Sequence, residues 1–204
     1  VGRTAPEAVR SLSGVEAVAI KANLTAPDAA ERIIEAIPDL SAVSLVVVAG
    51  GGPHLKGLVS EHSSEQQLQL WRSITEGPMR LISAFHAQTT QPYHLITVAS
   101  TSAIAVRRDE TWYATAQAAR RSFALNFHSQ LAQRGGTSLV VCPGGMKTGL
   151  WASSPVDTDN FMDPEVVASL VWEQADQQDP GELKEIVIRR DLQGNPQPQV
   201  VDAS

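Results

Sequence analysis

The stretch SAVSLVVVAGGG, residues 41–52, decides the fold class of this chain. Four apolar residues at 45–48 follow one another without a polar break, and glycines end the run. A short, branched and continuous apolar run is typical of a strand that is buried on both faces, as strands are in parallel sheets. We expect four further strands, over 15–24, 93–100, 137–145 and 185–190.

Helical patterns alternate with these strands, over 25–37, 64–88, 111–133 and 163–175. The second helix is expected to kink at Gly77-Pro78, because proline has no backbone N–H to continue the helix. The tail beyond residue 190 is rich in turn formers and is expected to be peripheral. Alternation of strand and helix predicts an α/β fold, a doubly wound parallel sheet in three layers, α/β/α. We expect a single domain over 1–204, since no linker or repeat interrupts the chain.

Composition argues against several classes of protein. Hydrophobic residues make up 43% of the chain, which is enough for a sizeable core. The formal net charge is −6 and no basic cluster occurs, which argues against a nucleic-acid partner. No apolar run approaches the roughly 18 residues of a membrane helix. The single cysteine, Cys142, is expected to be a buried thiol, and the histidines show no metal-ligand spacing. We therefore expect a soluble, cytoplasmic protein with no metal, membrane or nucleic-acid partner.

The ends of the expected strands carry the candidate site, because ligands of parallel α/β sheets bind beyond the carboxyl ends of the strands. Ser100 ends one strand, and Tyr113 follows thirteen residues later near a helix start. The Pro-Gly pair at 143–144 ends the next strand, and Thr148 follows four residues after that glycine. Together with Ala-Gly-Gly at 49–51, this spacing resembles the short-chain dehydrogenase/reductase family over nearly the whole chain.

The resemblance implies a Rossmann-like fold, a nicotinamide cofactor and a role for each matching residue. In that family a serine hydrogen-bonds the substrate carbonyl and a tyrosine supplies or removes a proton, roles that fall to Ser100 and Tyr113. Gln117 completes the expected catalytic set, in the place of the family's lysine. The expected cofactor-binding residues are Arg3, Asn23, Leu24, Ala49, Gly50, Gly51, Pro143, Gly144, Met146 and Thr148. Arg3 stands where the family often pairs an arginine with the 2′-phosphate of NADP, so NADP is expected, with NAD as the alternative.

Gln117 is the most consequential departure from the family. A phenol has a pKa of about 10, and a cation one helical turn away lowers that pKa toward the range that general acid–base catalysis favours. Gln117 can hydrogen-bond a ribose hydroxyl but carries no charge. Valines replace two family asparagines at 47–48, and the family's helix asparagine should fall near Ile74 or Thr75, neither of which is an amide. We therefore expect a degenerate catalytic tetrad.

The start of the chain departs from the family as well. The glycine-rich turn after the first strand, which places a pyrophosphate on a helix N-terminus, is not in this sequence. The run AGGGPHLKG at 49–57 does not fit G-x-G-x-x-G and is not expected to replace it. Without its central first strand, the sheet would have exposed edges. We expect that roughly 30 to 40 upstream residues, one strand and one helix, are missing from the chain.

The leading interpretation is an oxidoreductase that transfers a hydride between NADP(H) and a small-molecule alcohol, ketone or aldehyde. The alternative is a non-catalytic protein of the same fold, such as a cofactor or ligand sensor or a pseudo-enzyme subunit. A lyase or epimerase is a weaker third interpretation. The resemblance also implies a homodimer or homotetramer that pairs through the segments 64–88 and 111–133.

The remaining charged and aromatic residues are not expected to have a defined role in the chemistry. Arg120 and Arg121 are expected as surface or interface charges, since about 10 Å of helix rise separates Arg120 from Tyr113. The histidines are expected in loops or on the surface. Lys147 is expected either to meet a cofactor phosphate or to be solvated, with solvation favoured. Trp151 is expected either to close over a ligand or to pack against the sheet edge.

Overall fold

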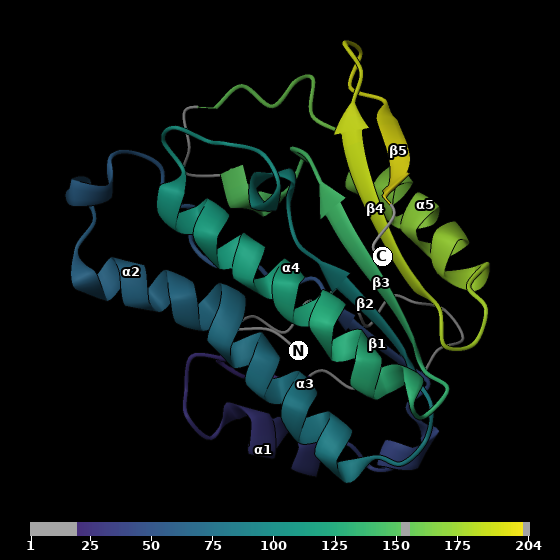
Figure 1. Cartoon of the computed structure of the whole chain (residues 1–204). Coiled ribbons are helices and arrows are strands. Elements are labelled where there is room, and N and C mark those ends of the chain that lie inside the picture. The colour runs from purple at the N-terminus through teal and green to yellow at the C-terminus, as the bar shows by residue number, and fades with distance from the viewer. Residues whose placement is uncertain (1–19, 152–155, 202–204) are drawn as a thin grey trace.

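The computed structural model describes residues 20–151 and 156–201, and a five-stranded sheet runs through its centre (Figure 1). The strands lie in the order β1-β2-β3-β4-β5. They are β1 (Leu45–Val48), β2 (His94–Val98), β3 (Thr137–Pro143), β4 (Leu183–Arg190) and β5 (Pro196–Val201). The first four are parallel, as predicted, and β5 runs antiparallel to β4. Of the strand predicted over 15–24, only residues 20–24 are described, and they contain one isolated bridge residue, Lys21.

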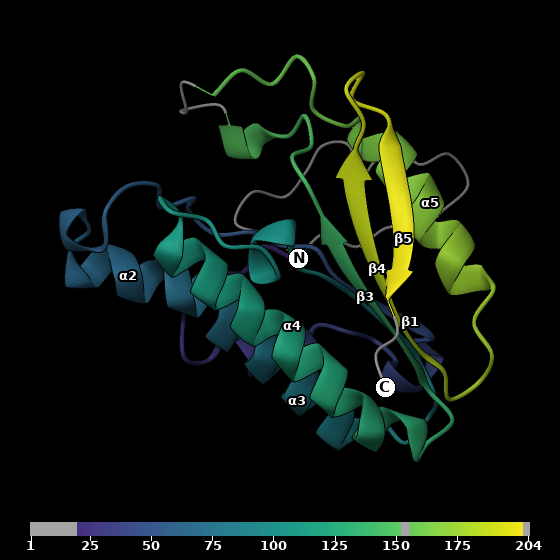
Figure 2. The ribbon, with the colours of Figure 1, turned by 45° about the horizontal axis from the view of Figure 1, so that its top comes forward.

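Helices cover both faces of the sheet, which confirms the three-layer α/β/α arrangement. The helices are α1 (Ala29–Glu35), α2 (Ser64–Trp71), α3 (Gly77–Gln88), α4 (Thr111–Ala132) and α5 (Pro164–Asp176). Figure 2 shows α3 and α4 on one side of the strands and α5 on the other. Alternate strand residues supply the two cores: Leu95 packs with residues of α1, α3 and α4, whereas Ile96 packs with residues of α5. Within the described residues, no helix is both long enough and apolar enough to cross a membrane.

The tail beyond β4 is not peripheral, so that prediction was wrong. β5 pairs with β4 along its whole length, from Glu185–Val201 to Arg190–Pro196. A tight turn makes the reversal: Asp191 Oδ1 accepts hydrogen bonds from the backbone N–H groups of Gln193 and Asn195, and Gly194 takes a φ of 87°. The two prolines of β5 are tolerated because an edge strand does not need every N–H for the ladder.

The predicted kink at Gly77-Pro78 takes the form of a π-helical turn. Residues Arg72–Glu76 form this turn between α2 and α3, and the N–H of Gly77 donates to the carbonyl of Arg72. π turns inside helices free backbone groups and often mark functional sites. Gly77 itself is required by packing, since a Cβ at this position would collide with the carbonyl oxygen of Leu24.

The register brings three strand ends to one edge of the sheet. Val48 pairs with Thr97, and Val98 pairs with Val141, so β1, β2 and β3 finish beside one another. The backbone beyond each strand therefore borders the same space, as the sequence predicts for a ligand site.

Arg121 is not a free surface charge, contrary to the prediction. It forms a two-pronged ion pair with Glu185 of β4, with Nε–Oε1 and Nη2–Oε2 distances of 2.6 Å each. Glu185 is only 1% exposed, and the thiol of Cys142 also donates to its Oε1 at 3.6 Å. Cys142 is the buried thiol that the sequence predicts, and burial raises its pKa to about 12. The pair fastens α4 to the sheet.

Arg121→Met should lower the free energy of unfolding by about 3–5 kcal/mol, because it leaves the carboxylate of Glu185 buried without a partner. Urea unfolding at neutral pH measures this loss. The matched control is Arg32→Met, which removes an exposed pair with Asp28 and should cost less than about 1 kcal/mol. Equal losses in the two variants would show that the Arg121–Glu185 pair does not fasten the helix.

Candidate active site

Two adjoining cavities open beyond the carboxyl ends of β1, β2 and β3. The smaller one has a volume of about 430 Å³ and the larger one about 1060 Å³. Their shared wall consists of His54, Ala99, Tyr113, Met146, Thr148 and Leu150. A group that acts on molecules in both cavities has to lie on this wall.

Ser100 and Tyr113 meet at the smaller cavity, as their spacing predicts. Ser100 follows β2 and caps a short 3₁₀ turn at Thr101–Ala103, where its Oγ accepts a hydrogen bond of 3.1 Å from the backbone N–H of Ser102. Tyr113 lies in the first turn of α4 and packs against Leu70 and Ile74. Gln117 and Ser100 both act on the phenol of Tyr113, in the direction that lowers its pKa.

The environment of Tyr113 keeps its phenol protonated at neutral pH. Burial is the largest influence and raises the pKa of Tyr113, while hydrogen bonds with Gln117 and Ser100 and the charge of Arg120 lower it. The nearby carboxylate of Glu110 raises this pKa further. The net shift is upward, so Tyr113 is a proton donor at neutral pH and a base only at higher pH.

Gln117 presents an unused acceptor to the larger cavity. Its side chain is 2% exposed and lines that cavity. Its Oε1 is buried and has no hydrogen-bond partner among the described residues. Buried polar atoms are nearly always paired in native proteins, so an open acceptor on a cavity wall points to a hydroxyl or amide of a ligand.

Arg120 is buried, and the prediction that it is a surface or interface charge was wrong. Its side chain is 3% exposed and donates to three backbone carbonyl groups. The Nε–O distance to Ile74 is 2.6 Å, the Nη1–O distance to Val98 is 3.0 Å, and the Nη2–O distance to Gly50 is 2.7 Å. Burial lowers the pKa of Arg120 to about 10, so it remains charged at neutral pH.

The Ile74 carbonyl is available to Arg120 because of a proline four residues later. In a regular helix this carbonyl would accept from the N–H of residue 78, but Pro78 has none. The π turn at the same place shifts the backbone bonding and contains Ile74 and Thr75, the positions expected for the family's asparagine. Thr75 adds a second link to α4, because its Oγ1 donates to the carbonyl of Ala116 at 3.0 Å.

A histidine–carboxylate pair borders the same site and was not predicted. His54 Nε2 lies 3.4 Å from Glu110 Oε1, and Glu110 Oε2 accepts a hydrogen bond of 2.9 Å from Ser102. The His54 ring stands edge-on to Tyr113, with 4.7 Å between the ring centroids. His54 lies in a loop, as predicted, but its side chain is only 8% exposed. The signals for the pair were the place of His54 after the glycine turn at 49–52 and the place of Glu110 directly before α4.

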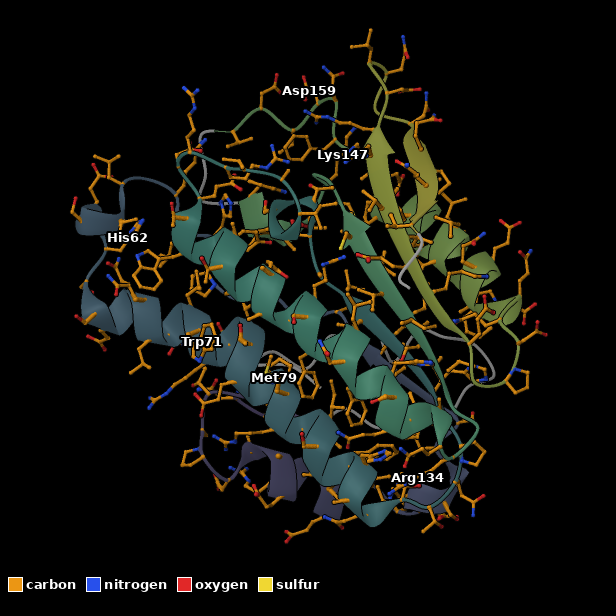
Figure 3. All side chains as sticks on the ribbon, viewed as in Figure 1. His62, Trp71, Met79, Arg134, Lys147 and Asp159 are labelled. Atoms are coloured by element: carbon orange, nitrogen blue, oxygen red, sulfur yellow. The ribbon has the colours of Figure 1, made fainter. Side chains whose placement is uncertain are left out.

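The loop after β3 forms the far wall of the smaller cavity. Pro143, Gly144, Met146 and Thr148 all line it, and Met146 forms a bridge with Met162. Trp151 Nε1 donates to the carbonyl of Met146 at 2.9 Å, and its ring stands edge-on to His54, so Trp151 faces the cavity. Lys147 is exposed at this end of the molecule (Figure 3) and lines neither cavity.

The other expected cofactor residues are only partly brought together. Ala49, Gly50 and Gly51 line the larger cavity, and a Cβ on either glycine would meet nothing within 4 Å. Asn23 and Leu24 line neither cavity; Asn23 Oδ1 instead accepts from the backbone N–H of Thr25. Arg3 lies outside the described residues.

A sequence model of a known family matches residues 2–159, and its description is short chain dehydrogenase. A curated relative, 1-deoxy-11-beta-hydroxypentalenate dehydrogenase of Streptomyces exfoliatus, is 30% identical over 172 residues. The match covers 78% of this chain and 62% of that protein, so the chain spans less than two thirds of the relative's length.

Solved structures with low sequence identity share the fold. The angucycline C-6 ketoreductase LanV with bound NADP has a TM-score of 0.73 at 19% identity, covering 88% of this chain and 78% of that one. A short-chain dehydrogenase/reductase from Vibrio parahaemolyticus has a TM-score of 0.72 at 21% identity, with coverages of 84% and 77%. A 3-oxoacyl-[acyl-carrier protein] reductase from Brucella melitensis in complex with NAD has a TM-score of 0.63 at 18% identity, with coverages of 74% and 64%.

Proposed function

Because the chain belongs to the short-chain dehydrogenase/reductase family, we propose that it transfers a hydride between NADP(H) and a small alcohol, ketone or aldehyde. The observation that carries the proposal is the meeting of Ser100 and Tyr113, with Tyr113 on the wall that the two cavities share. A cofactor in the larger cavity and a substrate in the smaller one would both reach Tyr113.

The larger cavity fits a nicotinamide cofactor. Gly50 and Gly51 leave their backbone open to the cavity, and Gln117 Oε1 offers an unpaired acceptor for a ribose hydroxyl. Ala49, Met146 and Thr148 complete the group of described residues that would hold it. When bound, the cofactor supplies the hydride for reduction or accepts it in oxidation. NADP is proposed over NAD from the family position of Arg3, and LanV, a structural relative, has NADP bound.

Ser100 and Tyr113 perform the proton chemistry. In reduction, Ser100 donates a hydrogen bond to the substrate carbonyl oxygen, and Tyr113 gives its phenolic proton to that oxygen as the carbonyl carbon gains the hydride. The phenolate that remains takes a proton from solvent to complete the cycle. In oxidation the roles reverse, and Tyr113 must start as the phenolate. Its raised pKa therefore favours reduction at neutral pH.

Three arginines indicate that the substrate carries a negative charge. Arg107, Arg189 and Arg190 line the smaller cavity, and none of them forms an ion pair with a described carboxylate. Their hydrogen-bond partners are neutral: Thr101, Gln199 and the carbonyl of Asn160. The curated relative is named for a pentalenate, itself a carboxylate. We therefore propose a carboxylate or similar anion on the substrate, held by charge-assisted hydrogen bonds.

Tyr113→Phe should lower turnover at least about 100-fold, because general acid–base catalysis contributes that much or more. NADPH affinity, measured by fluorescence titration, should change by less than threefold. Tyr93→Phe is the matched control, since Tyr93 is buried far from the cavities, with its hydroxyl 3.2 Å from His86 Nδ1. NADPH binding without turnover of any acidic or neutral carbonyl would instead support the non-catalytic alternative.

The rate of alcohol oxidation should rise about tenfold per pH unit from pH 7 to about 10, because the phenolate fraction of Tyr113 grows in that proportion below its raised pKa. Carbonyl reduction uses the protonated phenol and should stay constant over the neutral range. Initial rates in both directions across this range provide the measurement. An oxidation rate that levels off below pH 9 would contradict the assignment of Tyr113 as the base.

Replacing Arg107, Arg189 and Arg190 together by glutamine should lower kcat/KM for a keto acid about 10- to 100-fold, the usual effect of losing hydrogen bonds to a charged group. The methyl ester of the same keto acid should be affected less than threefold. Arg108→Gln is the control, because Arg108 is exposed beside Arg107 but does not line the cavity. Equal losses for acid and ester would exclude an anion-binding role.

The single domain over 1–204, the homodimer or homotetramer and the cytoplasmic location stay predictions of the sequence.

A further inference from the structure

Arg120 is unusual among the charged residues of this chain because it is buried without an acidic partner. None of the ion pairs between described residues includes Arg120. Removing a cation from water is costly, and an unpaired one is rarely kept without a reason. The three carbonyl groups that it contacts are neutral dipoles, so they satisfy its hydrogen bonds without cancelling its charge.

Two of the three carbonyl groups belong to residues that line the larger cavity, and the third belongs to the turn that packs against Tyr113. Gly50 follows β1, Val98 ends β2, and Ile74 lies in the π turn against which Tyr113 packs. Hydrogen bonds from a charged donor are about twice as strong as neutral ones, so one side chain fixes these segments relative to α4. Arginine suits this task because its planar fork presents several N–H groups in different directions.

Arg120 and Tyr113 both lie on the buried face of α4. Side chains on a helix lean toward its N-terminus, so Arg120 reaches back along α4 in the direction of Tyr113. Both residues line the larger cavity. The charge of Arg120 also lowers the pKa of Tyr113, against the larger effect of burial. The other titratable groups near Tyr113 are Glu110 and its partner His54.

We infer that Arg120 is a positioning residue whose buried positive charge favours the phenolate of Tyr113. In the family, a lysine at the place of Gln117 has this effect; in this chain it comes from Arg120, further along α4. This inference rests on the proposed function, in which Tyr113 is the acid/base. The site still contains a cation near the tyrosine, but at position 120 rather than 117, about one turn further along the same helix face. At this place the cation both hydrogen-bonds the backbone and favours the phenolate of Tyr113.

The test measures ionisation of Tyr113 directly, in the full chain and without turnover. The sequence has only two tyrosines, so a Tyr93→Phe background leaves Tyr113 as the single source of phenolate absorbance. In this background we compare Arg120→Lys, which keeps the charge, with Arg120→Gln, which keeps a hydrogen-bond donor but no charge. Both lose the planar fork of arginine and keep N–H donors, so the charge is the main difference between them. Circular dichroism with thermal melts confirms that both are folded.

The apparent pKa of Tyr113 should be at least about one unit higher in Arg120→Gln than in Arg120→Lys, the size expected for removal of a nearby charge. Equal pKa values in the two folded variants would overturn the inference and leave Arg120 a structural clamp. If neither variant folds, the double variant Gln117→Lys/Arg120→Gln is measured instead. A double variant that folds, but in which the pKa of Tyr113 is not lower than in the Tyr93→Phe background, would also overturn the inference.

Kinetics separate this inference from the proposed function. The oxidation rate at pH 8 should fall about tenfold or more in Arg120→Gln and recover in Gln117→Lys/Arg120→Gln, because the second change restores a cation one turn from Tyr113. Absence of recovery, with an unchanged fold, would count against the inference. A chain that never turns over, yet shows the pKa difference, would refute the proposed function and retain the electrostatic role of Arg120.

Discussion

Three hydrogen bonds from the guanidinium of Arg120 hold the site together. They join α4 to the end of β1, to the end of β2 and to the π turn between α2 and α3. Each of these segments ends or breaks regular structure at that point, so its carbonyl group would otherwise be short of a donor. A side chain that satisfies all three makes the positions of the cavity walls depend on one another, and Tyr113 lies on the wall that results.

The charge distribution of the site differs from that of the whole chain. The formal net charge is −6, yet the two cavities are bordered by Arg107, Arg120, Arg189 and Arg190. Among the described residues, Glu110 is the one carboxylate that lines them, and it contacts His54 and Ser102. Positive charge at the cavities of an acidic protein concentrates anionic ligands there, while the negative charge of the rest of the surface repels other acidic proteins. The proposed ligands, a dinucleotide phosphate and an anionic carbonyl compound, both match this field.

The sequence predicts periodic features well and long-range polar contacts poorly. The parallel strands, the extent of α4 and the meeting of Ser100 with Tyr113 follow from local pattern and spacing. β5 was missed because its prolines resemble a loop, although an edge strand tolerates them. The burial of Arg120 was missed because its charge was taken as a sign of exposure. Its position indicates burial, since it lies on the same buried helical stripe as Ala116, Gln117 and Ala124. The partners of Arg120 and Arg121 are 22 to 70 residues away, and no local pattern reveals them.

The absent N–H of Pro78 couples two positions that lie 42 residues apart in the sequence. Residue 78 cannot donate to the carbonyl of Ile74, and Arg120 Nε donates to it instead. The cost of replacing Arg120 therefore depends on residue 78, because a backbone N–H there would leave this carbonyl a partner once the guanidinium is gone. Substitutions at the two positions should accordingly have effects on stability that do not add.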